Sequence, residues 1–228
     1  MSISGIRKSL RRNGFKARRK PNTNFVSATN QRLRLAWALK HRHLTIGDWR
    51  KWVFSDETKV NMWGSDGNSF YWTNGDRIVQ PHQIRPKVQG DGGGVMFWSC
   101  ITAEEPGYGT TIAEGSIDAP LHVHILETSL LDTLEYYDMT PNNVRFQQDR
   151  ATPHTSNITK QWFTDNGFNL EKINDWPAQS PDLNPIEHLW HLLKIRLYKY
   201  STRATTKEQL EKRINDEWYK ITKEECQK

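Results

Sequence analysis

The chain has 228 residues, of which 36% are hydrophobic and 25% are charged, a composition typical of a globular protein that buries a core without disulfides. The two cysteines, Cys100 and Cys226, match no metal-ligand spacing, which favours a reduced, intracellular protein. No run of 18 apolar residues is present and no apolar segment follows the basic N-terminus, so we expect neither a membrane span nor a secretory signal.

The net charge of +6 is concentrated at the N-terminus. The first 20 residues hold eight basic side chains and no acid, so the rest of the chain carries a net charge of −2. A basic arm on a nearly neutral body indicates contact with nucleic acid, although a solvated tail or a nuclear-import signal explains the same pattern. The basic residues of the arm are Arg7, Lys8, Arg11, Arg12, Lys16, Arg18, Arg19 and Lys20.

The first half of the chain predicts two helices followed by three strands. Residues 4–13 form a short basic helix, and apolar residues three and four positions apart predict another over 29–43. The strands are WVFSDETKV, SFYWT and, after the flexible turn GDGGG, VMFWSCIT. The last of these has no charged residue, which places it in the middle of a sheet.

The second half predicts helices that alternate with strands. Helices are expected over 122–134, 155–166, 186–199 and 207–221, the last capped by Thr206 with Gln209 three residues on. NVRFQQD and FNLEKIND are the predicted fourth and fifth strands, and PAQSPDLNP is a loop. This order predicts an α/β fold with a mixed sheet and helices on both sides.

Three acids occupy positions where such folds carry chemistry. Asp56 lies within the first strand, Asp149 ends the fourth, and Glu187 begins a helix after a rigid loop. Hard divalent cations prefer oxygen ligands, and two of them clamp the attacking and leaving oxygens of a phosphoryl displacement. Carboxylates from separate elements that meet at one point suit this chemistry.

Each acid also has an ordinary structural interpretation. Asp56 is explained by solvation or a turn, with Glu57 as the competing acid, and Asp149 by an Asx turn. Glu187 stands where a capping-box acid would, with Asn184 as N-cap and Pro185 at the first helical position. Spacing alone does not choose between the two interpretations.

The surrounding sequence does choose. WVFSDETKV, GGGVMFWSCIT, VRFQQDRATPHTS and DWPAQSPDLNPIEHLWHLLK, in this order over roughly residues 25 to 200, resemble the catalytic domain of Tc/mariner-type DDE transposases. The resemblance implies that Asp56, Asp149 and Glu187 are the catalytic metal ligands. It also implies a ribonuclease-H-like fold, two Mg²⁺ or Mn²⁺ ions, and cut-and-paste movement of inverted-repeat DNA. We further expect a dimer on DNA and a location in the nucleus.

The N-terminal segment SGIRKSLRRNGFKARRKP resembles the final helix of the second helix-turn-helix of these proteins, with its basic linker. We therefore divide the chain into a helix-turn-helix remnant over 1–24 and a catalytic domain over 25–228. An isolated recognition helix does not hold its own geometry, which argues against sequence-specific binding of element ends by this segment. The 37 residues between Asp149 and Glu187 exceed the usual spacing, with the surplus near LEKIND.

Two other functions use the same carboxylates. One is a host-adopted transposase that binds DNA without moving it, and the other is a ribonuclease-H-type hydrolase of RNA–DNA hybrids. His154 is either structural or orients a phosphate or carboxylate. Most of the ten tryptophans are expected in the core, although three near loops are candidates to stack on a base: Trp63, Trp72 and Trp176.

Overall fold

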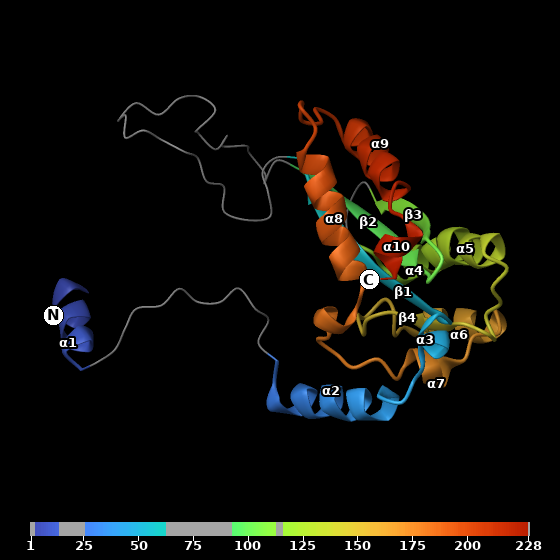
Figure 1. Cartoon of the computed structure of the whole chain (residues 1–228), viewed down its shortest axis with the longest axis horizontal. Helices are drawn as coiled ribbons and strands as arrows, with labels where there is room; N and C mark the ends of the chain where they lie inside the picture. Colours follow the sequence, from blue (N-terminus) through green and yellow to red (C-terminus); the bar gives the residue numbers. More distant parts are fainter. Residues whose placement is uncertain (1–2, 14–25, 63–92, 113–115, 228) are drawn as a thin grey trace.

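The computed structural model describes residues 3–13, 26–62, 93–112 and 116–227. In this part of the chain four strands form one sheet in the order β3-β2-β1-β4 (Figure 1). Their bounds are β1 Trp52–Asn61, β2 Gly94–Ile101, β3 Pro106–Ile112 and β4 Arg145–Gln147. The β1–β2 and β2–β3 pairs are antiparallel and the β1–β4 pair is parallel, which confirms the predicted mixed sheet.

The central strand β2 is buried on both faces. Val95, Phe97 and Ile101 pack into the cluster on one face, and Trp98 and Cys100 into the cluster on the other. All five side chains are at most 2% exposed. Alternating residues of a strand point to opposite faces, so an uncharged strand of this kind requires cover on both sides.

Helices supply that cover (Figure 1). The face of Trp98 is covered by α4 Ala119–Ile125, the π-helical segment η3 Leu126–Leu130, α5 Leu131–Tyr136, α6 Asn157–Asp165 and α7 Leu170–Ile173. The face of Phe97 is covered by α8 Ile186–Tyr198 and α9 Lys207–Trp218. The remaining helices are α1 Ile3–Arg12, α2 Ala28–His41, α3 Ile46–Trp49, the 3-10 turn η4 Pro181–Leu183 and α10 Lys223–Cys226. None of the helices in these described ranges is long and apolar enough to cross a membrane.

Side-chain caps explain where most of the predicted helices begin. Ser27, Ser156 and Thr206 each accept a hydrogen bond from the backbone amide three residues on, which satisfies an otherwise unpaired donor of the first turn. The Gln209 side chain accepts from the amide of Thr205 rather than from that of Thr206, so the predicted capping box is not formed.

Two predictions about strands need correction. The fifth strand predicted in FNLEKIND is wrong, because Asn169 caps a short helix there, α7, through the amide of Lys172 at 3.1 Å. The structure instead has β3, which the sequence did not predict, as the edge strand beside β2. The predicted strand SFYWT lies outside the described residues, as do Trp63 and Trp72.

Helix α2 packs on the loop that leads into α8. Trp37 of α2, Trp52 of β1 and Trp176 of the loop form a buried aromatic cluster, so Trp176 is a core residue and not a stacking platform. An ion pair between Arg34 and Asp182, 2.5 Å between Nη2 and Oδ2, fixes the same loop farther along. Helix α2 thus fixes the loop that precedes Glu187.

Candidate active site

The parallel pairing of β1 with β4 positions Asp56 and Asp149. The register of β1 against β4 pairs Phe54 with Gln147, and each aspartate stands two residues beyond its strand's member of that pair. Because parallel strands run in the same direction, the register places Asp149, just beyond the end of β4, level with Asp56 within β1. The prediction that these two acids come together from separate strands is consistent with this register.

Glu187 is brought to the same place by a hydrogen bond between the loop and β1. The Asn184 side-chain amide donates to the backbone carbonyl of Ser55, with 3.1 Å between nitrogen and oxygen. Pro185 directly precedes α8 and offers no side-chain hydrogen bond to it. The Asn184 side-chain oxygen nevertheless accepts from the amide of Ile186 at 3.4 Å, as the predicted cap would. The amide of Asn184 donates to the carbonyl of Pro181, so the capping box with Glu187 is not formed. The side chain of Asn184 points into the protein, where it is buried.

The ionisation of Asp56 is affected by its burial and by the acids near it. Burial raises the pKa of Asp56 to about 8, and the charges of Glu57, Glu187 and Asp149 add to the effect. Burial also raises the pKa of Glu187, and a hydrogen bond with Asp56 opposes that rise. In the absence of a cation, Asp56 is thus mostly protonated at neutral pH, and its carboxyl group hydrogen-bonds with Glu187.

His154 holds the third acid. Its Nδ1 lies 2.6 Å from Oδ1 of Asp149, and the amide of Ala151 donates to the same oxygen at 2.9 Å. Burial alone would raise the pKa of Asp149, but these two hydrogen bonds and the charge of His154 lower it. The Asx-turn interpretation and the functional one are therefore compatible here. Of the two roles foreseen for His154, the structure shows the orientation of a carboxylate.

Glu57, the competing acid, belongs to the other face of the sheet. Asp56 lies on the same face of β1 as Phe54 and Val60, which pack towards α8 and α9. Glu57 lies on the opposite face with Val53, which packs towards α4 and α6. The carboxylate of Glu57 accordingly reaches His154, with 3.3 Å between Oε1 and Nε2. Only one of the two adjacent acids in SDET shares the face of Glu187.

The donor set fits a hard divalent cation. Asp56 lies in β1, Asp149 in the segment after β4 and Glu187 in α8. They offer only carboxylate oxygens, the ligands that Mg²⁺ and Mn²⁺ prefer. Burial first, and then the neighbouring acids, keep a proton on Asp56 at neutral pH, and a bound cation would displace it.

The predicted DNA-binding residues are described only in part. Four of them lie on α1, where the side chains of Lys8, Arg11 and Arg12 are exposed and Arg11 and Arg12 form the last turn. Exposure on one short helix is compatible with contact to phosphates and does not test it. The other four lie outside the described residues: Lys16, Arg18, Arg19 and Lys20.

Comparison with known proteins gives a consistent result. Residues 51–211 match the DDE superfamily endonuclease family. The chain is 37% identical over 195 residues to the Tc1 transposase of Caenorhabditis elegans, which covers 84% of this chain and 68% of the relative. It superposes on a Mos1 transposase paired-end complex with left transposon end, with a TM-score of 0.71 at 15% identity, over 98% of this chain and 65% of that one.

A second solved structure matches at the scale of one domain. The Mos1 transposase catalytic domain with Raltegravir and Mg superposes with a TM-score of 0.61 at 15% identity, over 90% of this chain and 89% of that one. At such identities the structural likeness concerns the fold alone. The chain spans about two thirds of the length of the Tc1 relative and of the Mos1 protein in the paired-end complex.

Proposed function

Because the chain belongs to the Tc1/mariner family of DDE transposases, with the ribonuclease-H-like fold of their catalytic domain, we propose that it is the catalytic part of a cut-and-paste DNA transposase. Its reaction is the hydrolytic cutting of DNA strands at inverted-repeat ends, followed by attack of the freed 3′-hydroxyl on target DNA. Asp56, Asp149 and Glu187 are the proposed catalytic residues.

The observation that carries the proposal is the proximity of Glu187 and Asp149 to the buried Asp56. Each comes from a different part of the chain, and the pKa of Asp56 rises to about 8 from burial and from the charges of its acidic neighbours. A fold rarely gathers like charges in this way unless function requires it, because the gathering costs stability. Binding of metal ions for the cleavage of DNA strands explains why these carboxylates lie near one another.

We propose that these three residues hold two Mg²⁺ or Mn²⁺ ions. The donor set fits, and the Mos1 catalytic domain has been described with Mg. When bound, such ions lower the pKa of the attacking water or hydroxyl and neutralise charge on the phosphate that is cut. Asp56 would give up its proton on loading, so uptake of the ions would release protons at neutral pH.

The protein's own residues supply orientation and contact with the substrate. His154 fixes the carboxylate of Asp149 through its Nδ1, and Asn184 fixes the beginning of α8 against β1. Both contacts reduce the freedom of a catalytic side chain before substrate arrives, which lowers the entropic cost of reaching a reactive arrangement. The basic arm, Arg7 to Lys20, contacts the DNA backbone and draws the domain to it.

The partners and location follow from the same proposal. The substrates are element ends and target DNA, the protein acts as a dimer on DNA, and it works in the nucleus. Support for end binding comes from the Mos1 protein, whose structure is described as a paired-end complex with a transposon end. Whether residues 1–24 are a helix-turn-helix remnant bears on end recognition and not on the chemistry.

The deciding experiment offers the purified chain three substrates in Mg²⁺ or Mn²⁺: supercoiled DNA carrying candidate inverted repeats, the same DNA without them, and an RNA–DNA hybrid. Nicking of DNA that depends on metal and on Asp56 supports the proposal, and joining of a pre-cut 3′-end to a plasmid extends it to strand transfer. Cleavage of the hybrid alone would favour a ribonuclease. DNA binding without cleavage in either metal would favour a host-adopted, inactive relative.

A further inference from the structure

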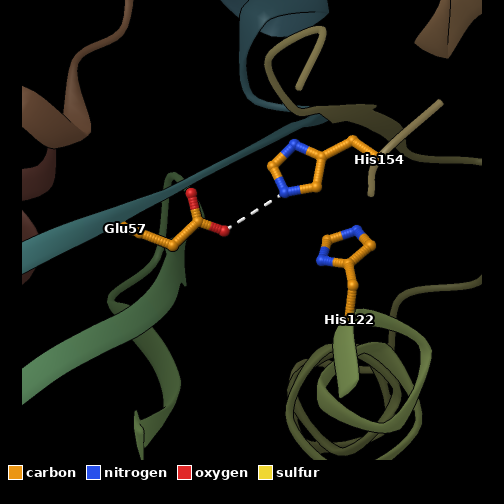
Figure 2. Close-up of side chains that lie close together, drawn as sticks. All are labelled: Glu57, His122 and His154. Atoms are coloured by element: carbon orange, nitrogen blue, oxygen red, sulfur yellow. Dashed lines mark ion pairs between the residues drawn. The ribbon is translucent and has the colours of Figure 1, made fainter. Parts of the chain in front are cut away.

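A second group of ligand-type side chains lies behind the catalytic carboxylates, on the opposite face of β1. It consists of Glu57 from β1, His122 from α4 and His154 from the segment after β4 (Figure 2). One ligand atom of each lies within 4.8 Å of those of the other two. In the part of the chain that the structure describes, no other three His, Cys, Asp or Glu side chains meet this closely.

The hydrogen bonds around His122 fix which of its nitrogens carries the proton. The Gln148 side chain donates its Nε2 to the carbonyl of His154 at 3.0 Å, so its Oε1 is free to accept. That oxygen lies 3.0 Å from Nε2 of His122, which must therefore be the protonated nitrogen. The lone pair of His122 is then on Nδ1, and Figure 2 shows this nitrogen on the side of the ring that faces Glu57.

His154 is arranged in the same way. Its Nδ1 is engaged by Asp149 at 2.6 Å, and its Nε2 is turned towards Glu57 (Figure 2). In both histidines the outer nitrogen donates to a side-chain oxygen and the inner nitrogen points into the group. This is the arrangement that orients histidines in metal sites, where a carboxylate or carbonyl oxygen holds the ring nitrogen that does not bind the ion.

The interior of the group has one donor at most, the Nε2 of His154, which lies 3.3 Å from Oε1 of Glu57. His122 is fully buried and His154 is 6% exposed, and their ring centroids are 4.1 Å apart. Among the described residues, Nδ1 of His122 has no hydrogen-bond partner, and Oε1 of Glu57 has only its ion-pair contact with His154. A proton on Nε2 of His154 can be shared with Glu57 but leaves His122 unpaired. Buried acceptors without a partner are costly, and a cation in contact with all three atoms removes that cost.

We propose that Glu57, His122 and His154 form a zinc site, distinct from the catalytic carboxylates. Two imidazole nitrogens and one carboxylate oxygen are typical ligands of Zn²⁺, with a water in the fourth position, and they suit Mg²⁺ poorly. The ion anchors the His154 ring, and the ring in turn holds Asp149. Zn²⁺ at this place is therefore a structural support for one catalytic carboxylate and takes no part in cutting DNA.

The test uses Co²⁺ as a coloured substitute for Zn²⁺. Metal-free chain carrying Glu187→Gln, which disables the carboxylate trio as a competing site, is titrated with Co²⁺ and followed by visible absorption. Four-coordinate Co²⁺ with nitrogen ligands absorbs far more strongly than octahedral Co²⁺ held by oxygens. We expect one such strongly absorbing Co²⁺ per chain, displaced by Zn²⁺ and unaffected by an excess of Mg²⁺.

Two variants assign the site. His122→Gln keeps a donor towards Gln148 and lacks the inner nitrogen, and it should weaken Co²⁺ binding at least tenfold. His124→Gln, an exposed position on the same helix, is the matched control and should bind as before. Glu57→Gln provides an independent test if His122→Gln does not fold. An unchanged spectrum in both Glu57→Gln and a folded His122→Gln, or no strong absorption in the parent protein, overturns the proposal and leaves a hydrogen-bonded histidine pair. DNA cleavage is not the readout, so either proposal can fail without the other.

Discussion

The side chain of Asn184 donates a hydrogen bond to the backbone carbonyl of Ser55 across 129 residues of sequence. Ser55 immediately precedes Asp56, and Asn184 stands three residues before Glu187. The bond therefore joins the backbone segments that carry two of the three proposed catalytic acids. Since Asn184 is buried, loss of the bond would leave the Ser55 carbonyl without this partner in a place that water does not easily reach.

Asn184→Ala should accordingly affect catalysis more than stability. A lost buried hydrogen bond costs roughly 1–3 kcal/mol of unfolding free energy. DNA cleavage should fall by more than tenfold in protein that remains folded at the assay temperature, because α8 is no longer fixed against β1. Asn157→Ala, at the exposed first residue of α6, is the control. Equal activity of the two variants would show that the bond has no role in positioning Glu187.

Asp56→Asn and Asp149→Asn should each abolish metal-dependent strand cleavage while the protein stays folded. Asparagine keeps the size of the side chain but lacks the negative charge that a hard divalent cation requires. Cleavage assays with far-UV circular dichroism and thermal melts distinguish lost chemistry from lost folding. Asp132→Asn, exposed on α5, should cleave like the parent. Full activity of either active-site variant, free of contamination by the parent protein, would remove that residue from the site.

Glu187→Gln separates a ligand role from a merely structural one. The variant should melt at the same temperature as the parent or higher when metal is absent, because repulsion with Asp56 and Asp149 is relieved. It should lose much of the rise in melting temperature that Mg²⁺ or Mn²⁺ gives the parent, which corresponds to about 2.7 kcal/mol at 100 times the dissociation constant. Glu135→Gln, exposed on α5, is the control. A variant that keeps both the metal-induced shift and the activity would mean that the third ligand lies elsewhere.

The raised pKa of Asp56 predicts how the stability of metal-free protein depends on pH. Burial first, and then neighbouring acids, raise this pKa to about 8, whereas an aspartate in the unfolded chain titrates near about 4. Between those values the folded state binds a proton that the unfolded state lacks, so the unfolding free energy falls as pH rises through this window. In Asp56→Asn the fall should be shallower. Melts in a chelator at pH 5 and pH 8.5 give the comparison, and parallel curves would contradict the assignment.

Deletion of residues 1 to 20 should weaken non-specific DNA binding and reduce its dependence on salt. If about half of the eight basic residues touch phosphate, the arm contributes on the order of −4 to the slope of log affinity against log salt. Fluorescence anisotropy with a labelled duplex over a range of salt concentrations measures this slope. An unchanged slope would mean that the arm acts as a localisation signal or not at all in DNA binding.

The sequence predicted the elements whose pattern is set locally. The uncharged run of β2 and the apolar stripes of α8 and α9 gave those elements within a few residues. It missed β3, PGYGTTI, since two glycines and two threonines carry no strand pattern. That strand depends on distant partners, including Trp218, whose indole nitrogen donates to the Gly107 carbonyl at 3.0 Å. The strand predicted at LEKI was wrong because a local cap, Asn169, outweighed the apolar residues around it.

Part of the candidate site could likewise be predicted from the sequence, and part could not. The three acids were named from family motifs, and the strand register places two of them, Asp56 and Asp149, level with each other. The partnership of His122 with His154 could not be foreseen, because His122 looked like one more position on a helical stripe. Nothing in the sequence indicates that α4 packs on α6 so that the two imidazoles stand together. His154 was weighed as a residue that orients a carboxylate, but Asp149 and Glu57 became identifiable as its partners only in three dimensions.

Asp56 and Glu57 are adjacent in β1 and point to opposite faces of the sheet. The placement of both acids therefore depends on the length of this strand as much as on its residues. A one-residue insertion or deletion between Val53 and Asp56 would turn each later side chain to the opposite face of the sheet. Asp56 would then face His122 and His154, and Glu57 would face Glu187. Among descendants of this gene, a substitution in β1 should therefore reduce function by an amount that depends on the residue, whereas a change in the length of β1 should abolish it. Additions and losses of residues should gather in connections such as the one that holds α7.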